Sequence, residues 1–202
     1  MADNTAIMAG RLINFPIKLS KRMKTNQVCT LALDEAMAIT NCDGGTFYLP
    51  HRDGLAFQYM VTKSKNWKLN SSDGTRMPWP VPMRKEYVCA YVAMSQKPIN
   101  IMDVYNATEY DFKGTYKYDR ENQYRTKSML VVPLSTESSG LMGILQLINS
   151  MDEEGNTIPF MTKHVQYIQS LGAMTALKLD NISLRAEDAM DEGPINMKNQ
   201  YI

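Results

Sequence analysis

The chain has 202 residues, of which 44% are hydrophobic, and this predicts a packed core in one domain of generous size or one domain with helical extensions. Its 22 Lys and Arg residues nearly balance 21 Asp and Glu residues, so it lacks the basic footprint of a nucleic-acid-binding protein. Residues 1–11 lack the apolar core of a signal peptide, and no apolar run is long enough to cross a membrane. Three widely spaced Cys residues without a Cys-x-x-Cys pair are typical of a reduced, cytoplasmic protein. We therefore expect a cytoplasmic protein with neither a nucleic-acid nor a membrane partner.

The N-terminal part predicts a helix after a lead-in segment. Residues 1–18 are mixed in character, and we expect them to be a partly ordered lead-in. Apolar spacing over Leu19–Thr40 predicts a helix with two narrow apolar stripes. Two stripes indicate two partners, its own sheet and a neighbouring chain, although one broad core face explains the pattern equally well.

The next elements are strands and a long connection. The sequence predicts two strands joined by an Asp-Gly hairpin turn, at Thr46–Leu49 and Leu55–Thr62. The connection Asn66–Lys85 carries a Pro-Trp-Pro-Val-Pro run at residues 78–82. Either Trp79 folds this loop onto the body of the protein, which we expect, or the run is a polyproline-type ligand for another domain.

A short helix over Glu86–Gln96, stopped by Pro98, leads to an extended piece ending at Ile101. Asp103 is a good helix N-cap, and the aromatic and charged segment Tyr105–Tyr124 shows neither helical nor strand periodicity.

Two apolar runs around Ser135–Gly140 predict a hairpin of buried strands. Both runs are too apolar to have a wet face, so we expect the sheet to be covered on both sides. Apolar spacing of alternating three and four residues predicts one long helix from Pro159 to about Ala186, in which Gly172 lets a second helix approach. We expect residues 188–202 to fray.

Several strings together resemble a GAF domain, and they cover about residues 19–187. They are Cys42–Leu49 (CDGGTFYL), Ala90–Ala93 (AYVA), Ile99–Asp103 (INIMD), Tyr110–Thr115 (YDFKGT), Tyr124–Leu134 (YRTKSMLVVPL) and Gly143–Asn149 (GILQLIN). The set is most similar to GAF modules ahead of HD-type phosphohydrolases and nucleotide cyclases in bacterial signalling proteins, and to those of cyclic-nucleotide phosphodiesterases.

The resemblance implies an α+β fold with a central antiparallel sheet, terminal helices packed on one face and a ligand pocket on the other. It also implies a homodimer through the first and last helices. On that template the pocket residues are Phe47, Phe57, Tyr59, Ala90, Tyr91, Ile101, Asp103, Phe112, Asp119, Arg125, Ser128 and Leu130. Asp103, Asp119, Arg125 and Ser128 are those suited to a polar ligand. Taken singly, we expect Asp103 to be a helix cap and Arg125 to form a surface ion pair instead.

One departure from the family bears on the ligand. GAF domains that bind cyclic nucleotides typically carry an Asn-Lys pair and, later, a Phe followed at the fourth position by Asp-Glu, and that Lys and Asp form a salt bridge. Here Ser150 follows Asn149, and His164 and Val165 stand after Phe160. The resemblance therefore argues against cyclic-nucleotide binding.

Catalysis and metal binding have little support in the sequence. GAF-type methionine sulfoxide reductases use a Cys nucleophile, for which Cys89 is the one candidate here, without an obvious resolving Cys. His51 and His164 do not have metal-ligand spacing, so we expect no metal site. Asp111 and Asp119 could form a catalytic carboxylate pair, but we expect both side chains to be solvated.

We expect a non-catalytic sensor domain that binds an unknown small molecule and passes the signal through a dimeric last helix to a fused or partner output domain. A ligand-free GAF dimerisation module is the alternative.

Overall fold

An antiparallel sheet organises the computed structural model, which describes residues 4–191. The strands are β1 (Cys42–His51), β2 (Gly54–Thr62), β3 (Trp67–Asn70), β4 (Ile99–Ile101), β5 (Met129–Thr136), β6 (Gly140–Met151) and β7 (Thr157–Ile158). Within the described range they form one sheet in the order β3-β2-β1-β6-β5-β4, with β7 against β6. The helices are α1 (Asn4–Leu19), α2 (Thr25–Thr40), α3 (Val88–Ser95), α4 (Lys113–Asn122) and α5 (Thr162–Asp191), with short 3-10 turns η1 (Lys63–Lys65) and η2 (Ser71–Asp73).

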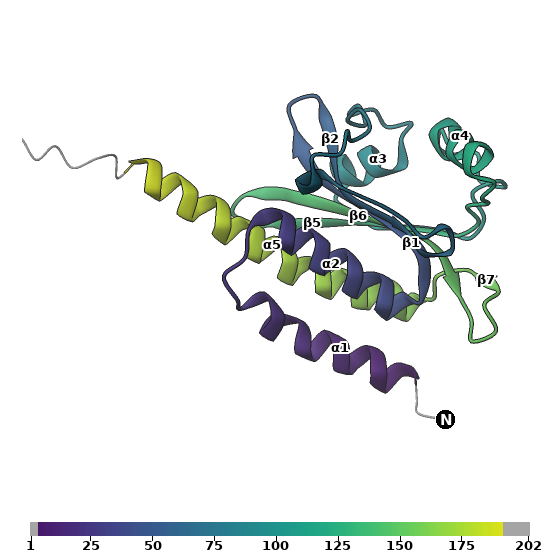
Figure 1. Cartoon of the computed structure of the whole chain (residues 1–202), viewed down its shortest axis with the longest axis horizontal. Helices are drawn as coiled ribbons and strands as arrows, with labels where there is room; N and C mark the ends of the chain where they lie inside the picture. Colours follow the sequence, from purple (N-terminus) through teal and green to yellow (C-terminus); the bar gives the residue numbers. More distant parts are fainter. Residues whose placement is uncertain (1–3, 192–202) are drawn as a thin grey trace, which may run out of the picture.

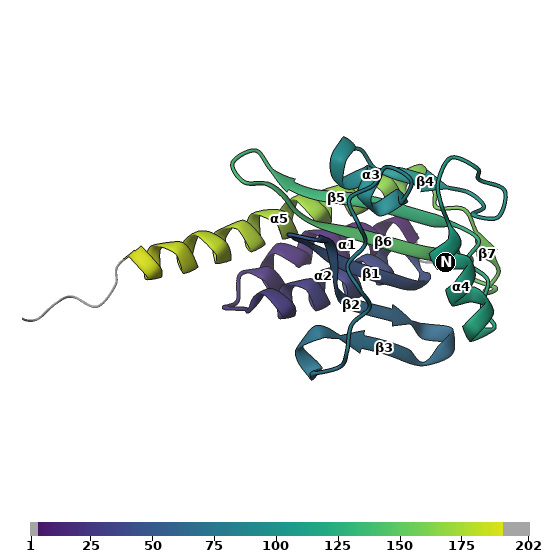
Figure 2. The same ribbon diagram turned by 90° about the horizontal axis from the view of Figure 1, so that it is seen from above.

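The helices lie in separate layers on the two faces of the sheet. Helices α2 and α5 pack side by side against one face, and α1 lies outside them (Figure 1). Helices α3 and α4 lie on the opposite face, and the C-terminal end of α5 extends beyond the sheet (Figure 2). This is the α+β arrangement expected from the sequence, with the terminal helices on one face.

The central strands β5 and β6 are covered on both sides, as their composition predicts. Along β5, Leu130, Val132 and Leu134 belong to the core under α2 and α5, whereas Met129 and Val131 belong to the core on the α3 side. Successive side chains of a strand point to opposite faces, so two buried faces require an apolar run without polar alternation. The hairpin around Ser135–Gly140 is confirmed.

The N-terminal part differs from expectation because it forms two helices. Residues 4–19 form α1 rather than a partly ordered lead-in. Residues 20–24 are not helical and connect α1 to α2, which begins at Thr25. Phe15 is fully buried and Leu19 is 6% exposed, so apolar burial holds α1 in place although Pro16 lies inside it. Helix α1 of the same chain packs against α2 and α5, where the second apolar stripe had left open either a neighbouring chain or one broad core face.

Strands β3 and β7 and helix α4 were missed in the sequence. Strand β3 pairs with β2 inside the connection that we expected to lack structure, and α4 lies inside the segment Tyr105–Tyr124. Helix α4 has no apolar stripe, because the side chains that join it to the body are tyrosines and the carboxylate of Asp119. Helix α5 continues through residues 188–191, where we expected fraying, and the rest of that expectation lies outside the described residues.

Within residues 4–191, no helix combines the length and apolar character needed to cross a membrane.

Candidate functional site

A cavity of about 420 Å³ lies on the sheet face that carries α3 and α4. Its size is within the range of small-molecule sites, about 300–1,000 Å³. Strands β1, β2, β3, β5 and β6 contribute lining residues, and so do α3, α4 and the segments before these two helices. The lining residues are Gly45, Thr46, Tyr48, Phe57, Met60, Val61, Thr62, Trp67, Pro78, Trp79, Pro80, Val81, Pro82, Tyr87, Val88, Cys89, Asp111, Phe112, Gly114, Thr115, Tyr118, Thr126, Met129, Gln146 and Ile148.

In β1 and β6, strand alternation decides which side chains reach the cavity. In β1, Thr46 and Tyr48 line it, whereas Phe47 between them is fully buried in the core under α2 and α5. In β6, Gln146 and Ile148 line it in the same way. A side-chain period of two places these residues on one face without any further constraint.

The segment Pro78–Pro82, here called the strap, crosses the cavity and is held by its backbone. The N–H of Val81 donates to the carbonyl of Leu55 and the N–H of Leu55 donates to the carbonyl of Val81, each at 2.9 Å. Gly54 makes this approach feasible, since a Cβ at that position would lie 2.0 Å from the Val81 oxygen. Trp79 is 83% exposed, so our expectation that its side chain folds the loop onto the body is wrong.

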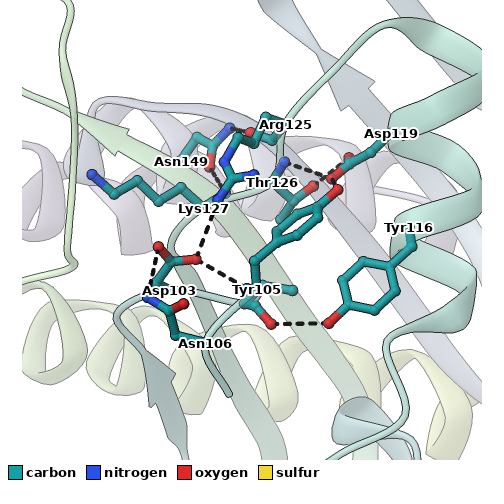
Figure 3. A network of polar contacts seen from close by, with 10 residues as sticks. Asp103, Tyr105, Asn106, Tyr116, Asp119, Arg125, Thr126, Lys127 and Asn149 are labelled. Atoms are coloured by element: carbon teal, nitrogen blue, oxygen red, sulfur yellow. Dashed lines mark hydrogen bonds and ion pairs between the residues drawn. The ribbon is translucent and has the colours of Figure 1, made fainter. Parts of the chain in front are cut away.

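Helix α4 is tethered through Asp119, a buried carboxylate near its C-terminal end. The N–H and hydroxyl of Thr126 each donate to Asp119 at 2.8 Å, and the Tyr105 hydroxyl donates to it at 2.8 Å (Figure 3). On the cavity side, the Tyr118 hydroxyl lies 2.8 Å from the hydroxyl of Thr62 on β2. These contacts fix the wall that α4 forms.

The predicted polar residues Asp103 and Arg125 lie outside this wall. The Arg125 guanidinium lies 4.1 Å from the centre of the Tyr105 ring and 4.0 Å from an Asp103 oxygen, with 60% of its side chain exposed. Asp103 accepts from the Tyr105 N–H at 2.9 Å in a turn rather than at a helix start (Figure 3). Both support the network around Asp119 from the surface, and neither lines the cavity.

The structure brings only part of the predicted site together. Phe57 and Phe112 line the cavity. Phe47, Tyr59 and Leu130 belong to the core on the opposite face, and the hydroxyl of buried Ser128 donates to the Ile158 carbonyl. Four further predicted residues, Ala90, Tyr91, Ile101 and Asp119, are not among the lining residues.

The lining is aromatic and nearly uncharged. Asp111 is its one charged residue among those described, and its carboxylate accepts from the N–H of Lys113 at the start of α4 at 2.9 Å. Burial raises the pKa of Tyr48 well above its ordinary value and also raises the pKa of Tyr118, so both phenols are neutral at physiological pH. No Lys, Arg or His is among the lining residues of the described chain.

Cys89 lines the cavity as a protonated thiol. It is 5% exposed, and burial raises its pKa to about 12. The two other thiols, Cys29 and Cys42, lie in the core under α2 and α5 on the other side of the sheet. A nucleophilic Cys needs a lowered pKa and a second thiol within reach to resolve the intermediate, and Cys89 has neither. Among residues 4–191, no three His, Cys, Asp or Glu residues lie close enough to hold a metal ion.

Comparison with known proteins agrees with this architecture. The model of the family described as "GAF domain" matches residues 25–179. The chain belongs to the GAF family. The GAF domain of a phosphoenolpyruvate-protein phosphotransferase from Coxiella burnetii superposes with a TM-score of 0.68 at 16% identity, over 93% of this chain and 99% of that one. The free methionine-R-sulfoxide reductase of Neisseria meningitidis gives 0.65 at 12% identity, over 92% and 95%. These likenesses show the fold.

A curated relative is a much longer protein. The dual 3′,5′-cyclic-AMP and -GMP phosphodiesterase 11 of Drosophila melanogaster is 26% identical over 148 residues, which are 67% of this chain and 10% of that protein. The chain therefore spans about a tenth of that relative's length. GAF domains are generally regulatory modules of signalling proteins and not catalysts.

Ser150 and His164 stand where GAF domains that bind cyclic nucleotides carry the Lys and Asp of their salt bridge, and both residues are buried here. The Ser150 hydroxyl donates to the Thr40 carbonyl at 3.0 Å. His164 is 2% exposed, its Nδ1 accepts from the Met161 N–H at 3.3 Å, and its Nε2 has no hydrogen-bond partner among the described residues. This GAF domain holds the start of α5 without that ion pair.

His164 makes stability depend on pH. Burial, assisted by the charge of Lys163, lowers the pKa of His164 from 6.5 to about 4. Between these values the unfolded chain binds a proton that the folded chain does not, so stability is complete above pH 6.5 and falls as the pH drops to 4. We expect a loss of about 2 kcal/mol from this group, measured by urea unfolding at pH 7.5, 6.0 and 4.5. His164→Gln should remove this component, and equal pH dependence in both proteins would contradict the assignment.

Proposed function

We propose that this GAF domain is a sensor that binds a small molecule in the cavity and changes the activity of a fused or partner output domain. The observation that carries the proposal is an open cavity of about 420 Å³ that combines aromatic side chains with hydroxyl and amide groups. Sites for small molecules typically have this composition. By resemblance, the output domain is an HD-type phosphodiesterase or a cyclase of a bacterial signalling protein.

The position of α5 supports a route from the cavity to the output. Met129 of β5 lines the cavity, and Leu130 and Leu134 on the other face of the same strand belong to the core with α5. At Gly172 of α5 a Cβ would lie 3.5 Å from Leu134, so helix and strand are in close contact. A ligand that binds one arrangement of β5 and α5 better than the other shifts the population of α5 states.

We propose that the domain works as a homodimer through α1 and α5, with α1 in place of the predicted first helix, which corresponds to α2 and lies under α1 (Figure 1). The supporting observation is that both helices expose large apolar side chains: Ile13 is 72% and Ile17 66% exposed on α1, and Leu177 is 63% and Leu184 49% exposed on α5. Exposed apolar side chains on neighbouring helices are typical of a protein–protein interface. The C-terminal end of α5 extends beyond the sheet (Figure 2), and we propose that this part of the helix contacts the output domain.

The dimer proposal predicts that two negative charges introduced on α5 of each protomer weaken dimerisation. The double variant Leu177→Glu/Leu184→Glu should weaken dimerisation by about 100-fold or more, because four like charges would face one another across the interface. Analytical ultracentrifugation over a range of concentrations measures this change. Leu177→Met/Leu184→Met is the matched control and should leave the dissociation constant within about threefold. An unchanged dimer in the Glu variant would reject these helices as the interface.

Native mass spectrometry tests the sensor proposal. Gentle ionisation should give twice the chain mass plus a small adduct that is released on activation, and the adduct mass begins to identify the ligand. A dimer without adduct that also fails to bind any compound in a broad metabolite screen would favour the alternative, a ligand-free dimerisation module. The open cavity with polar groups supports the sensor over that alternative, because a module without a ligand has no need for an unfilled cavity.

A further inference from the structure

We propose that the ligand of the cavity is an uncharged molecule with a planar heteroaromatic ring system, of about nucleobase or nucleoside size, and not a molecule that carries a phosphate. The inference rests on the proposed sensor function and specifies its ligand. Three features of the cavity carry it: the ring systems in its walls, the neutral polar groups between them and the placement of the Asp111 carboxylate.

Aromatic side chains come into the cavity from several walls. Tyr48 and Phe57 on the floor form a tilted pair with ring centres 4.8 Å apart. Trp67 and Tyr118 form a second pair at 6.0 Å, joining β3 to α4, and Phe112 adds a further ring at the start of α4. Rings that enclose a space from different directions favour a flat, polarizable ligand that stacks on one ring and meets the edges of others.

The polar groups of the cavity match ring nitrogens and carbonyl groups. The amide oxygen of Gln146 accepts from the Tyr48 hydroxyl at 3.3 Å, and among the described residues its amide nitrogen has no partner. Thr115, in the first turn of α4, also lines the cavity, and its hydroxyl has no partner in the described part of the chain. An amide and a hydroxyl supply neutral donors and acceptors, which suit a heteroaromatic edge.

The charge distribution disfavours a phosphate. The start of α4, where a phosphate would find free N–H groups, already holds the carboxylate of Asp111, 2.9 Å from the Lys113 nitrogen. The Lys113 ammonium lies 3.7 Å from the other Asp111 oxygen, but its side chain is 89% exposed and does not line the cavity. A phosphate would therefore lie beside a carboxylate without a lining cation to offset the repulsion. The start of α3, at Val88 and Cys89, offers backbone amides alone, which suffice for a carbonyl oxygen.

Matched pairs of probes test the inference. Isothermal titration calorimetry would compare adenosine with 3′,5′-cyclic AMP and guanosine with 3′,5′-cyclic GMP, since the members of each pair differ in the phosphate. We expect the better-binding nucleoside to bind about tenfold or more tightly than its cyclic nucleotide. Asp111→Asn should reduce that preference, whereas Lys117→Gln should leave it unchanged, because the Lys117 side chain is 67% exposed outside the cavity and pairs with Glu121. A cyclic nucleotide that binds more tightly than its nucleoside would overturn the inference.

A fragment screen by ligand-observed NMR separates this inference from the sensor function. Bicyclic heteroaromatic fragments of equal size would be tested in neutral, cationic and anionic series. Binding by the neutral series, lost in Thr115→Phe and retained in Lys117→Phe, supports the inference, because Thr115 lines the cavity and Lys117 is 67% exposed outside it. Binding confined to a charged series overturns the ligand class and leaves the sensor function standing. Absence of binding in every series, together with no binding by either nucleoside, overturns both.

Discussion

Gly54→Ala is expected to lower the free energy of unfolding by about 3 kcal/mol and to release the strap from the body of the domain. The Gly54 φ of 137° is unfavourable for a residue with a side chain, and a Cβ there would lie 2.0 Å from the Val81 oxygen. The paired hydrogen bonds between Leu55 and Val81 must therefore break. Urea unfolding measures the loss of stability, and trypsin should cleave after Arg76 and Arg84 faster than in the parent protein.

Gly74→Ala is the matched control for this experiment. Gly74 also has a positive φ, 71°, but no atom lies within 4 Å of the Cβ that alanine would add. It should cost about 1 kcal/mol from backbone strain alone and leave trypsin cleavage unchanged. Equal losses in the two variants would show that the contact with the strap contributes nothing.

Asp119→Ala is expected to destabilise the protein by about 3 kcal/mol and to free α4 from the body. Asp119 is 2% exposed and accepts three hydrogen bonds from Thr126 and Tyr105. Its removal leaves the N–H and hydroxyl of Thr126, itself 1% exposed, without an acceptor. Amide hydrogen exchange over residues 113–122 should accelerate by at least the factor that corresponds to the loss of global stability. Ligand affinity should also fall, because α4 forms a wall of the cavity.

Two variants separate the role of Asp119 from a general effect on α4. Tyr105→Phe removes one of the three hydrogen bonds and should cost about 1 kcal/mol. Asp111→Ala removes the acceptor at the other end of α4 and should cost a similar amount, as for loss of an N-terminal cap. If hydrogen exchange in α4 is as slow in Asp119→Ala as in the parent protein, the tether assigned to Asp119 is wrong.

Local composition was sufficient to predict most of the architecture. The apolar runs at Met129–Leu134 and Leu141–Asn149 read as buried strands because both of their faces pack against other layers. Regular apolar spacing likewise predicted α5, and the Asp-Gly turn predicted the hairpin of β1 and β2. Helix α4 was missed because tyrosines and a carboxylate, rather than an apolar stripe, join it to the body.

The sequence by itself determined the family, the two-sided sheet and the aromatic character of the segments around the site, because these depend on residue type and short-range spacing. The tertiary structure alone decided which of those residues meet. Thr46 and Tyr48 rather than Phe47 reach the cavity, but both faces of β1 are buried there, so alternation of polarity gives no indication of which face is which. The strap is held by Leu55 and α4 by contacts with Thr62 and Thr126, and these pairings depend on how distant segments pack. The cavity's near-neutral lining follows from that packing, since nearby charges such as Arg125 remain in solvent where their hydration is retained.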